Sequence, residues 1–378
     1  MDPFAPAFPG ELLPISIITG FLGSGKSTLL GQLLRQSDMG NSAVIVNELG
    51  EVGLDHILVE RIEGEVCLLQ SGCVCCSLRG DLEQALQKLI DQRERAVITR
   101  FDRVVIETTG LADPAPILQL ALTSPMIQRY FKLDAVVTTV DAVNGQRQLD
   151  ENPESVKQAA LADRILLTKT DLVSPQQLDR LEARLARLNP AAPRFRVLHG
   201  RIDAARLFNA DPTLHQAGAE DVAQWLGPQV GDLHDKAGAH AHGASADHVH
   251  ASGALNHDSH INHFSLSFDQ PLDWLTVAQW LSDLCAQWGE KLLRIKGVLD
   301  LAGESRPVAI HAIHHTFHPP AALSAWPDAT RGSRIVFITR DLSREVVQES
   351  WRAAGPAWGE QQVSSTDARR PHRSHRHH

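Results

Sequence analysis

Residues 14–30 read P-I-S-I-I-T-G-F-L-G-S-G-K-S-T-L-L, and this stretch limits the fold more than any other part of the chain. A short β-branched apolar run leads into a glycine-rich loop, and an amphipathic helix opens at Lys26. The loop matches the phosphate-binding pattern of nucleotide-hydrolysing proteins at Gly20, Gly25, Lys26 and Ser27. Glycines let backbone N–H groups approach phosphates, and the helix N-terminus adds partial positive charge. We therefore expect Lys26, a candidate catalytic residue, to hold the β- and γ-phosphates and Ser27 to ligate Mg²⁺.

Short apolar runs alternate with helical stretches through the first half of the chain, which predicts an α/β fold with a mostly parallel sheet. After the first strand, further strands are expected at Ala43–Asn47, Val66–Gln70, Arg103–Glu107, Ala135–Asp141, Arg164–Thr168 and Arg194–Leu198. Polar motifs follow several of these runs directly. Because ligands bind at the carboxyl ends of strands in such sheets, the motifs are expected to share one edge of a P-loop NTPase domain.

The motif E-T-T-G-L-A-D-P follows the expected strand at 103–107. Glu107 stands where a second phosphate-loop element has its carboxylate, usually an Asp. A carboxylate there would hold Mg²⁺ through a water, and the N–H of Gly110 would sense the γ-phosphate. The alternative is a solvent-exposed strand-end glutamate. The upstream loop favours the functional interpretation and makes Glu107 a second candidate catalytic residue.

The motif T-K-T-D, beginning at Thr168, is the candidate base-binding element and includes Lys169. The carboxylate of Asp171 can accept hydrogen bonds from both N1–H and the exocyclic amine of guanine. Adenine presents a lone pair at the equivalent ring nitrogen and would be repelled, so the motif favours GTP. The usual motif begins with Asn, and the Thr found here lacks the side-chain amide.

Cys73, Cys75 and Cys76 lie within four residues of one another, beside a glycine. Such a cluster can be a soft-metal site, a redox centre or a set of buried structural cysteines. Adjacent cysteines can bridge only through a strained ring, which disfavours the disulfide. Thiolates suit Zn²⁺ and Cu(I), and three ligands leave a fourth position exchangeable, so a metal site is favoured. Cys67 and Cys285 fall inside apolar patterns and are expected in the core.

The composition changes near residue 229. Eight histidines lie between His234 and His263 among small and polar residues. Residues 232–262 are therefore expected to form a flexible linker, which is either a soluble spacer or a weak store of Zn²⁺, Ni²⁺ or Co²⁺. The linker separates an N-terminal domain, residues 1–231, from a small α+β domain at residues 263–362, whose pattern of elements is ferredoxin-like. Residues 363–378 read as a disordered basic tail.

Whole-chain composition excludes several classes of protein. A net charge of −9 argues against a nucleic-acid binder, and no apolar run approaches a membrane span. The first residues lack the features of a secretory signal, and five cysteines with this clustering are not a disulfide framework. These features predict a cytoplasmic protein whose thiols stay reduced.

The motifs taken together resemble the CobW family of metal-handling GTPases, with its YjiA-like branch the most similar. The matching segments are G-F-L-G-S-G-K-S-T, N-E-L-G-E-V-G, G-C-V-C-C, E-T-T-G-L-A-D-P and A-D-R-I-L-L-T-K-T-D. The resemblance implies slow GTP hydrolysis and delivery of a metal to a client protein, zinc being the commonest assignment and cobalt or nickel others. It also implies that Gly23, Ser24 and Thr28 join the phosphate and Mg²⁺ site, and that Glu51 is a further candidate metal ligand.

The expected function is thus a GTP-dependent metallochaperone. Two alternatives stay open at this point: a metal-sequestering buffer with a regulatory nucleotide site, and a GTP-regulated assembly factor whose metal is structural. Metal transfer to a client in the GTP state but not in the GDP state separates the first from the other two.

Overall fold

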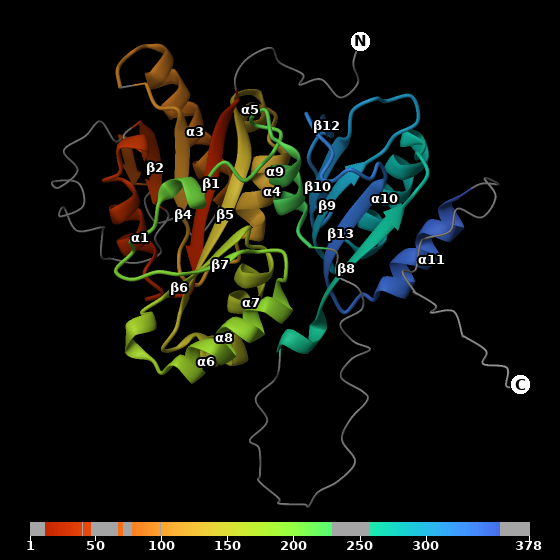
Figure 1. Cartoon of the computed structure of the whole chain (residues 1–378). Helices are drawn as coiled ribbons and strands as arrows, with labels where there is room; N and C mark the ends of the chain where they lie inside the picture. The colour runs from red at the N-terminus through yellow and green to blue at the C-terminus, as the bar shows by residue number, and fades with distance from the viewer. Residues whose placement is uncertain are drawn as a thin grey trace, which may run out of the picture.

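The computed structural model describes residues 12–39, 41–46, 67–70, 78–98, 100–228 and 257–355. The described chain forms two sheets that lie side by side, one in each half of the chain (Figure 1). The thiol cluster, Glu51, most of the predicted linker and the basic tail lie outside these residues. The division of the chain into domains and linker therefore stays a prediction.

The N-terminal domain is built on a parallel sheet of seven described strands in the order β3-β2-β4-β1-β5-β6-β7, which confirms the predicted α/β class. Its strands are β1 (Leu13–Gly20), β2 (Ser42–Val46), β3 (Cys67–Gln70), β4 (Arg103–Glu107), β5 (Phe131–Asp141), β6 (Arg164–Thr168) and β7 (Arg194–Arg196). Its helices are α1 (Lys26–Leu33), α3 (Leu78–Glu94), α4 (Ala115–Thr123), α5 (Pro125–Tyr130), α6 (Gly145–Glu151), α7 (Pro153–Ala160), α8 (Pro175–Leu188) and α9 (Ala219–Leu226).

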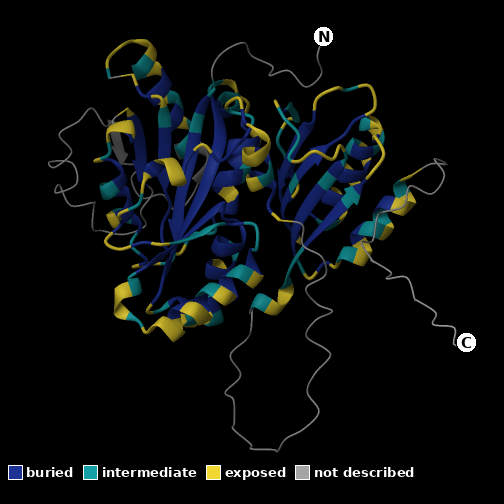
Figure 2. Ribbon diagram, viewed as in Figure 1, coloured by how far each residue is buried: buried dark blue, intermediate teal, exposed yellow. Residues whose placement is uncertain are grey.

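Helices cover both faces of this sheet, because successive side chains of each strand point to opposite sides. Ile15 and Ile17 of β1 are buried in one cluster with residues of α3 and α4, whereas Ile18 is buried in another with residues of α1. Figure 2 shows the strands as the buried centre and the outer helical faces as the exposed surface. Local signals set the helix boundaries: α8 begins with a capping box between Ser174 and Gln177.

The C-terminal domain is an antiparallel sheet covered by two helices, α10 (Trp274–Trp288) and α11 (Arg344–Ala354). Its described strands are β8 (Ile261–Phe268), β9 (Leu292–Leu299), β10 (Val308–Ile313), β11 (Thr316–Phe317), β12 (Ala321–Ala322) and β13 (Ser333–Arg340). β13 lies between β8 and β9, so β8-α10-β9 is a split β-α-β unit. The predicted α+β class is confirmed. In a ferredoxin-like βαββαβ order the second helix precedes the last strand, whereas α11 follows β13.

One strand-like run is interrupted in the structure. The sequence predicts a strand over Pro307–Phe317, but β10 and β11 form a hairpin, and His314 at the turn has φ 51°. His314 and His315 stand at this turn, and a pattern of apolar residues does not reveal that the chain reverses there. At the other end of the domain, β8 begins at Ile261, and the 3-10 helix His257–His260 precedes it.

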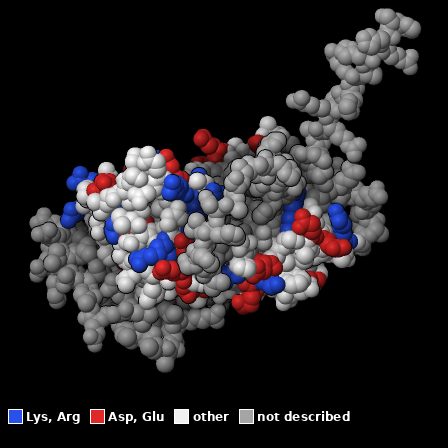
Figure 3. Space-filling view, turned by 90° about the horizontal axis from the view of Figure 1, so that it is seen from below, with Lys and Arg blue, Asp and Glu red and all other residues white. Residues whose placement is uncertain are grey.

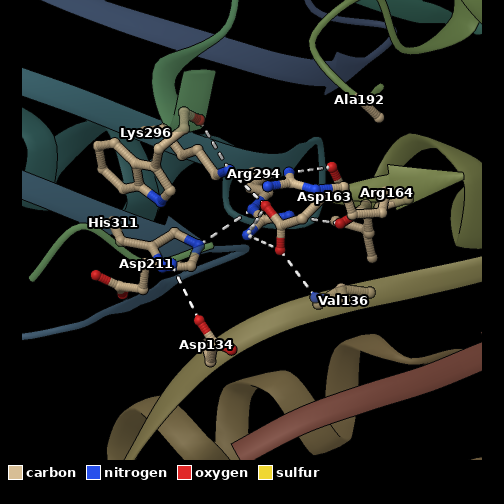
Figure 4. Close-up of polar contacts among 12 residues, drawn as sticks. Asp134, Val136, Asp163, Arg164, Ala192, Asp211, Arg294, Lys296 and His311 are labelled. Carbon is tan, nitrogen blue, oxygen red and sulfur yellow. Dashed lines mark hydrogen bonds and ion pairs between the residues drawn. The ribbon is translucent and has the colours of Figure 1, made fainter. Parts of the chain in front are cut away.

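The two domains meet at a buried ion cluster around Asp163, which directly precedes β6 (Figure 4). Arg294 and Lys296 of β9 approach its carboxylate to 3.1 and 2.5 Å, and the backbone N–H of Val136 donates to it at 2.9 Å. Burial acts to raise the pKa of Asp163, but the two cations hold it well below its usual range. Burial, with help from Arg294, lowers the pKa of Lys296 to about 8.

Arg294 also connects this cluster to its surroundings. Its guanidinium donates to the carbonyl oxygen of Leu161, just beyond α7, and its Nε donates to Nε2 of His311 at 3.1 Å. Burial, followed by the charges of Arg294 and Lys296, keeps the pKa of His311 well below its ordinary value, so the ring accepts as a neutral imidazole.

We predict that Asp163→Asn lowers the free energy of unfolding by about 3–5 kcal/mol, because two buried cations lose their counter-charge. Asp179→Asn is the matched control, since Asp179 pairs with Arg196 while 70% exposed and should change stability by less than about 1 kcal/mol. Urea unfolding of both variants measures the difference. Equal effects of the two substitutions would contradict a structural role for the buried cluster.

Candidate nucleotide site

The glycine-rich loop begins where β1 passes very close to β5. Gly20 has φ +146°, and a Cβ there would lie 2.2 Å from Oγ1 of Thr139 and 2.5 Å from its carbonyl oxygen. Gly20 and Thr139 are paired in the sheet, so this approach is fixed by the strand register. Only glycine fits, which explains this position of the motif physically.

Lys26 and Ser27 open α1 at the end of this loop. The Lys26 ammonium donates to the carbonyl oxygens of Gly20 and Phe21 at 3.0 and 3.3 Å, which places its charge inside the loop. The Ser27 hydroxyl donates to Oε1 of Glu107 at 2.9 Å. The structure thus brings together the two residues that the sequence assigns to Mg²⁺, although they are 80 positions apart. Hydroxyl and carboxylate oxygens are the ligand types that Mg²⁺ prefers, so these residues fit the ion.

Thr168 ties the end of β6 to the phosphate loop. Its hydroxyl donates to the carbonyl oxygen of Ser24 at 2.7 Å, and the Ser24 hydroxyl lies 2.6 Å from Oγ1 of Thr139. Thr168 and Ser24 are both buried. The Thr at the first position of the base motif is thus bonded directly to the phosphate loop through its side chain.

Lys169 makes a second link between the two loops. It adopts a left-handed backbone with φ 55°, and its ammonium donates to the carbonyl oxygen of Gly23 at 2.8 Å and to Oδ2 of Asp141 at 2.9 Å. Burial acts to raise the pKa of Asp141, but hydrogen bonds from Lys169, Asn144 and the Val143 N–H outweigh it and hold the pKa below its usual value.

Asp171 lies in the 3-10 helix Thr170–Leu172 and is exposed, so its carboxylate is open to a ligand. Gly110 belongs to the loop after β4 and lies against the phosphate loop. A Cβ at Gly110 would come within 2.5 Å of Cα and N of Leu22. The loop after β4 therefore rests directly on the phosphate loop. Thr28, by contrast, is exposed on α1. The roles of these residues toward a nucleotide stay predictions, and the structure supplies their neighbourhood.

Three residues of this site were missed by sequence reasoning: Thr139, Asp141 and Gly200. Asp141 is an acid at the carboxyl end of a strand, the same signal that marked Glu107, and it could have been found that way. Gly200 has φ +72°, and its Cβ would lie 2.8 Å from the Thr28 carbonyl oxygen, so the loop after β7 packs on the start of α1. Its surrounding sequence L-H-G-R carries no recognisable motif.

The predicted metal ligands Cys73, Cys75, Cys76 and Glu51 lie outside the described residues. Within the described ranges, no group of three or more His, Cys, Asp or Glu side chains could hold a metal ion. Cys285 is buried and free, and burial raises its pKa to about 12, which confirms its expected place in the core.

Comparison with known proteins agrees with this geometry. Residues 14–196 match the family model described as CobW/HypB/UreG, nucleotide-binding domain, and residues 261–355 match the cobalamin synthesis protein cobW C-terminal domain. The zinc chaperone YjiA of Escherichia coli is 33% identical over 339 residues, covering 90% of this chain and 98% of that protein. The zinc chaperone CobW of Pseudomonas aeruginosa is 29% identical and covers 90% of this chain and 91% of that protein.

A solved structure gives the same result for the fold. The crystal structure of Zn(II)-bound YjiA GTPase from E. coli has a TM-score of 0.65, 28% sequence identity, and covers 92% of this chain and 100% of that chain. The sheet order, phosphate loop and base motif define a P-loop nucleotide-binding domain joined to an antiparallel C-terminal domain. This chain belongs to the CobW family, which confirms the resemblance found in the sequence.

We predict that Thr168→Val weakens nucleotide binding about tenfold, because it leaves the buried Ser24 carbonyl without its hydroxyl donor. Thr123→Val is the matched control, since that exposed hydroxyl donates only to the Gln119 carbonyl of its own helix. Titration with a fluorescent nucleotide measures both affinities. Unchanged binding by Thr168→Val would show that the link between the two loops is dispensable.

Proposed function

We propose that this protein is a GTP-hydrolysing zinc chaperone. It binds Zn²⁺ through Cys73, Cys75 and Cys76, with Glu51 as a further ligand, and delivers the ion to a client protein in a nucleotide-dependent way. Cobalt and nickel are the alternative cargoes. The relatives named as zinc chaperones support zinc, and the fission yeast relative, 35% identical over 198 residues, is named a zinc-regulated GTPase metalloprotein activator.

One observation carries the proposal: three strands end level with one another at the nucleotide edge. Val46 of β2 pairs with Gln70 of β3 on one side and with Glu107 of β4 on the other. Neighbouring strands are about 5 Å apart, so β3 ends about 10 Å from Glu107. The chain then continues from Val46 into the segment with Glu51 and from Gln70 into the segment with the thiols. The two segments proposed to bind metal therefore continue from the same sheet edge as the carboxylate assigned to Mg²⁺.

The nucleotide chemistry follows from the same edge. Lys26 and the loop N–H groups would neutralise the phosphates, Glu107 and Ser27 would hold Mg²⁺, and the Gly110 N–H would contact the γ-phosphate. Mg²⁺ bound there would neutralise charge on the β- and γ-phosphate oxygens. The exposed carboxylate of Asp171 accepts from guanine, while Lys169 holds the base loop to the phosphate loop.

Partners and compartment follow from this chemistry. The proposed thiolate ligands must stay reduced, which supports a cytoplasmic location. No helix in the described ranges has the length and hydropathy to cross a membrane. On the face drawn in Figure 3, the described basic and acidic side chains are interspersed, unlike a nucleic-acid-binding surface. The partners are thus GTP, a divalent metal ion and a client metalloprotein.

A metal buffer is the second candidate. It shares the thiol site, but its zinc affinity would not depend on the nucleotide, and no client would receive metal selectively in the GTP state. Both segments continue from strands that end at the nucleotide edge, which favours the chaperone because loops that contact the γ-phosphate change order on hydrolysis.

For the base, we predict that Asp171→Asn loses affinity for GTP and gains affinity for xanthosine triphosphate, because an amide can donate to the xanthine oxygen. Asp179→Asn, an exposed change on the following helix, is the control and should bind GTP as the wild type does. Competition titrations with GTP, ATP and xanthosine triphosphate give the three affinities. Equal binding of ATP and GTP by the wild type would contradict guanine selectivity.

For the metal, we predict that a non-hydrolysable GTP analogue with Mg²⁺ raises zinc affinity roughly 5–150-fold over GDP, the range typical of linked sites. By reciprocity, zinc strengthens binding of the analogue by the same factor. Affinity should fall as pH drops, because the thiols must be deprotonated to bind. A chelating dye in competition measures zinc affinity in both nucleotide states.

The control for this experiment compares two cysteines. Cys75→Ser should remove the tight zinc site, whereas Cys285→Ala should leave it intact because Cys285 is buried in the core of the C-terminal domain. Equal zinc affinity in both nucleotide states of the wild type would leave the buffer as the better description. No loss of affinity in Cys75→Ser would move the metal site elsewhere.

A further inference from the structure

Two side chains of helix α7 bind the loop that follows β4. The side-chain amide of Gln158 donates to the carbonyl oxygen of Ala112 at 3.0 Å and to that of Gly110 at 3.5 Å. One residue earlier, the Lys157 ammonium lies 2.5 Å from Oδ2 of Asp113. Two neighbouring side chains of one helix thus fix three residues of the loop.

Gln158 is itself held firmly. It is 1% exposed, and its backbone carbonyl accepts from the hydroxyl of Thr138 in β5 at 2.8 Å. The far end of α7 is fixed by Asn189, whose amide donates to the carbonyl oxygens of Ala159, Ala160 and Ala162. Arg294 of the C-terminal domain donates to the carbonyl of Leu161, which lies directly after α7. The amide of Gln158 therefore reaches the loop from a rigid support.

The position of the loop matters because Gly110 has no room to move toward the phosphate loop. Its Cα already lies so near Leu22 that an added Cβ would be 2.5 Å from two Leu22 backbone atoms. The Gly110 N–H can face a γ-phosphate only if the loop keeps this place. Phosphoryl transfer depends almost entirely on such positioning, and small displacements carry large rate penalties.

We propose that Gln158 is a positioning residue for GTP hydrolysis: its amide holds the Gly110 loop in the place where the loop meets the γ-phosphate. The inference rests on the proposed GTPase activity and adds to it a residue that touches neither nucleotide nor metal. Lys157 has the same effect through Asp113, at a partly exposed position. GDP lacks the γ-phosphate, so its binding does not depend on this loop.

The test is steady-state GTP hydrolysis by Gln158→Met, which keeps the side-chain volume and removes both donors. We expect kcat to fall about tenfold or more, while GDP affinity and the unfolding temperature stay close to the wild-type values. Ser155→Ala is the matched control, because Ser155 lies one turn earlier on α7, and its buried hydroxyl has no hydrogen-bond partner in the described part of the chain. It should leave kcat unchanged.

Lys157→Gln keeps the test decisive if Gln158→Met does not fold. It should lower kcat severalfold with GDP affinity unchanged. A wild-type kcat in both Gln158→Met and Lys157→Gln would overturn this inference and leave the proposed function standing. A parallel loss of kcat, GDP affinity and stability would do the same. No GTP hydrolysis by the wild type would overturn the proposed function and this inference together.

Discussion

The carboxylate of Asp163 is the interaction on which the arrangement of the two domains depends. It is fully buried, and it meets two cations of β9 and the N–H of Val136. Removing such a group from water costs several kcal/mol, which is recovered only when every oxygen is paired. The need to pair this carboxylate therefore favours the observed position of the C-terminal sheet against the N-terminal domain.

The same strands connect this interface to the nucleotide edge. β6 starts directly after Asp163 and ends at Thr168, whose hydroxyl holds the phosphate loop. β5 contains Val136, whose N–H donates to Asp163, and it ends at Asp141, whose carboxylate pairs with Lys169. Both are paired strands inside the sheet, and all their residues are buried. Two buried, paired strands therefore connect the Asp163 cluster at one edge of the sheet with the nucleotide site at the other.

The sequence could predict the elements with strong local signals. The bounds expected for β4 and β6 are those observed, since each has a continuous apolar pattern and a clear polar end. The meeting of Ser27 with Glu107 also followed from strand topology. The hairpin at β10–β11 and the contacts of Gln158 did not, because they depend on contacts between segments far apart, which neither periodicity nor a motif encodes. The thiol cluster stays a prediction.

Helix α7 contacts both the loop after β4 and the C-terminal domain. Its residues 157 and 158 hold the loop expected to contact the γ-phosphate, and the carbonyl just beyond its end accepts from Arg294 of the C-terminal domain. A movement of this loop that carries α7 with it must therefore break or move the contact with β9. A movement that leaves α7 in place must instead break the bonds to Gln158. Helix α7 therefore links the nucleotide loop with the C-terminal domain through these hydrogen bonds.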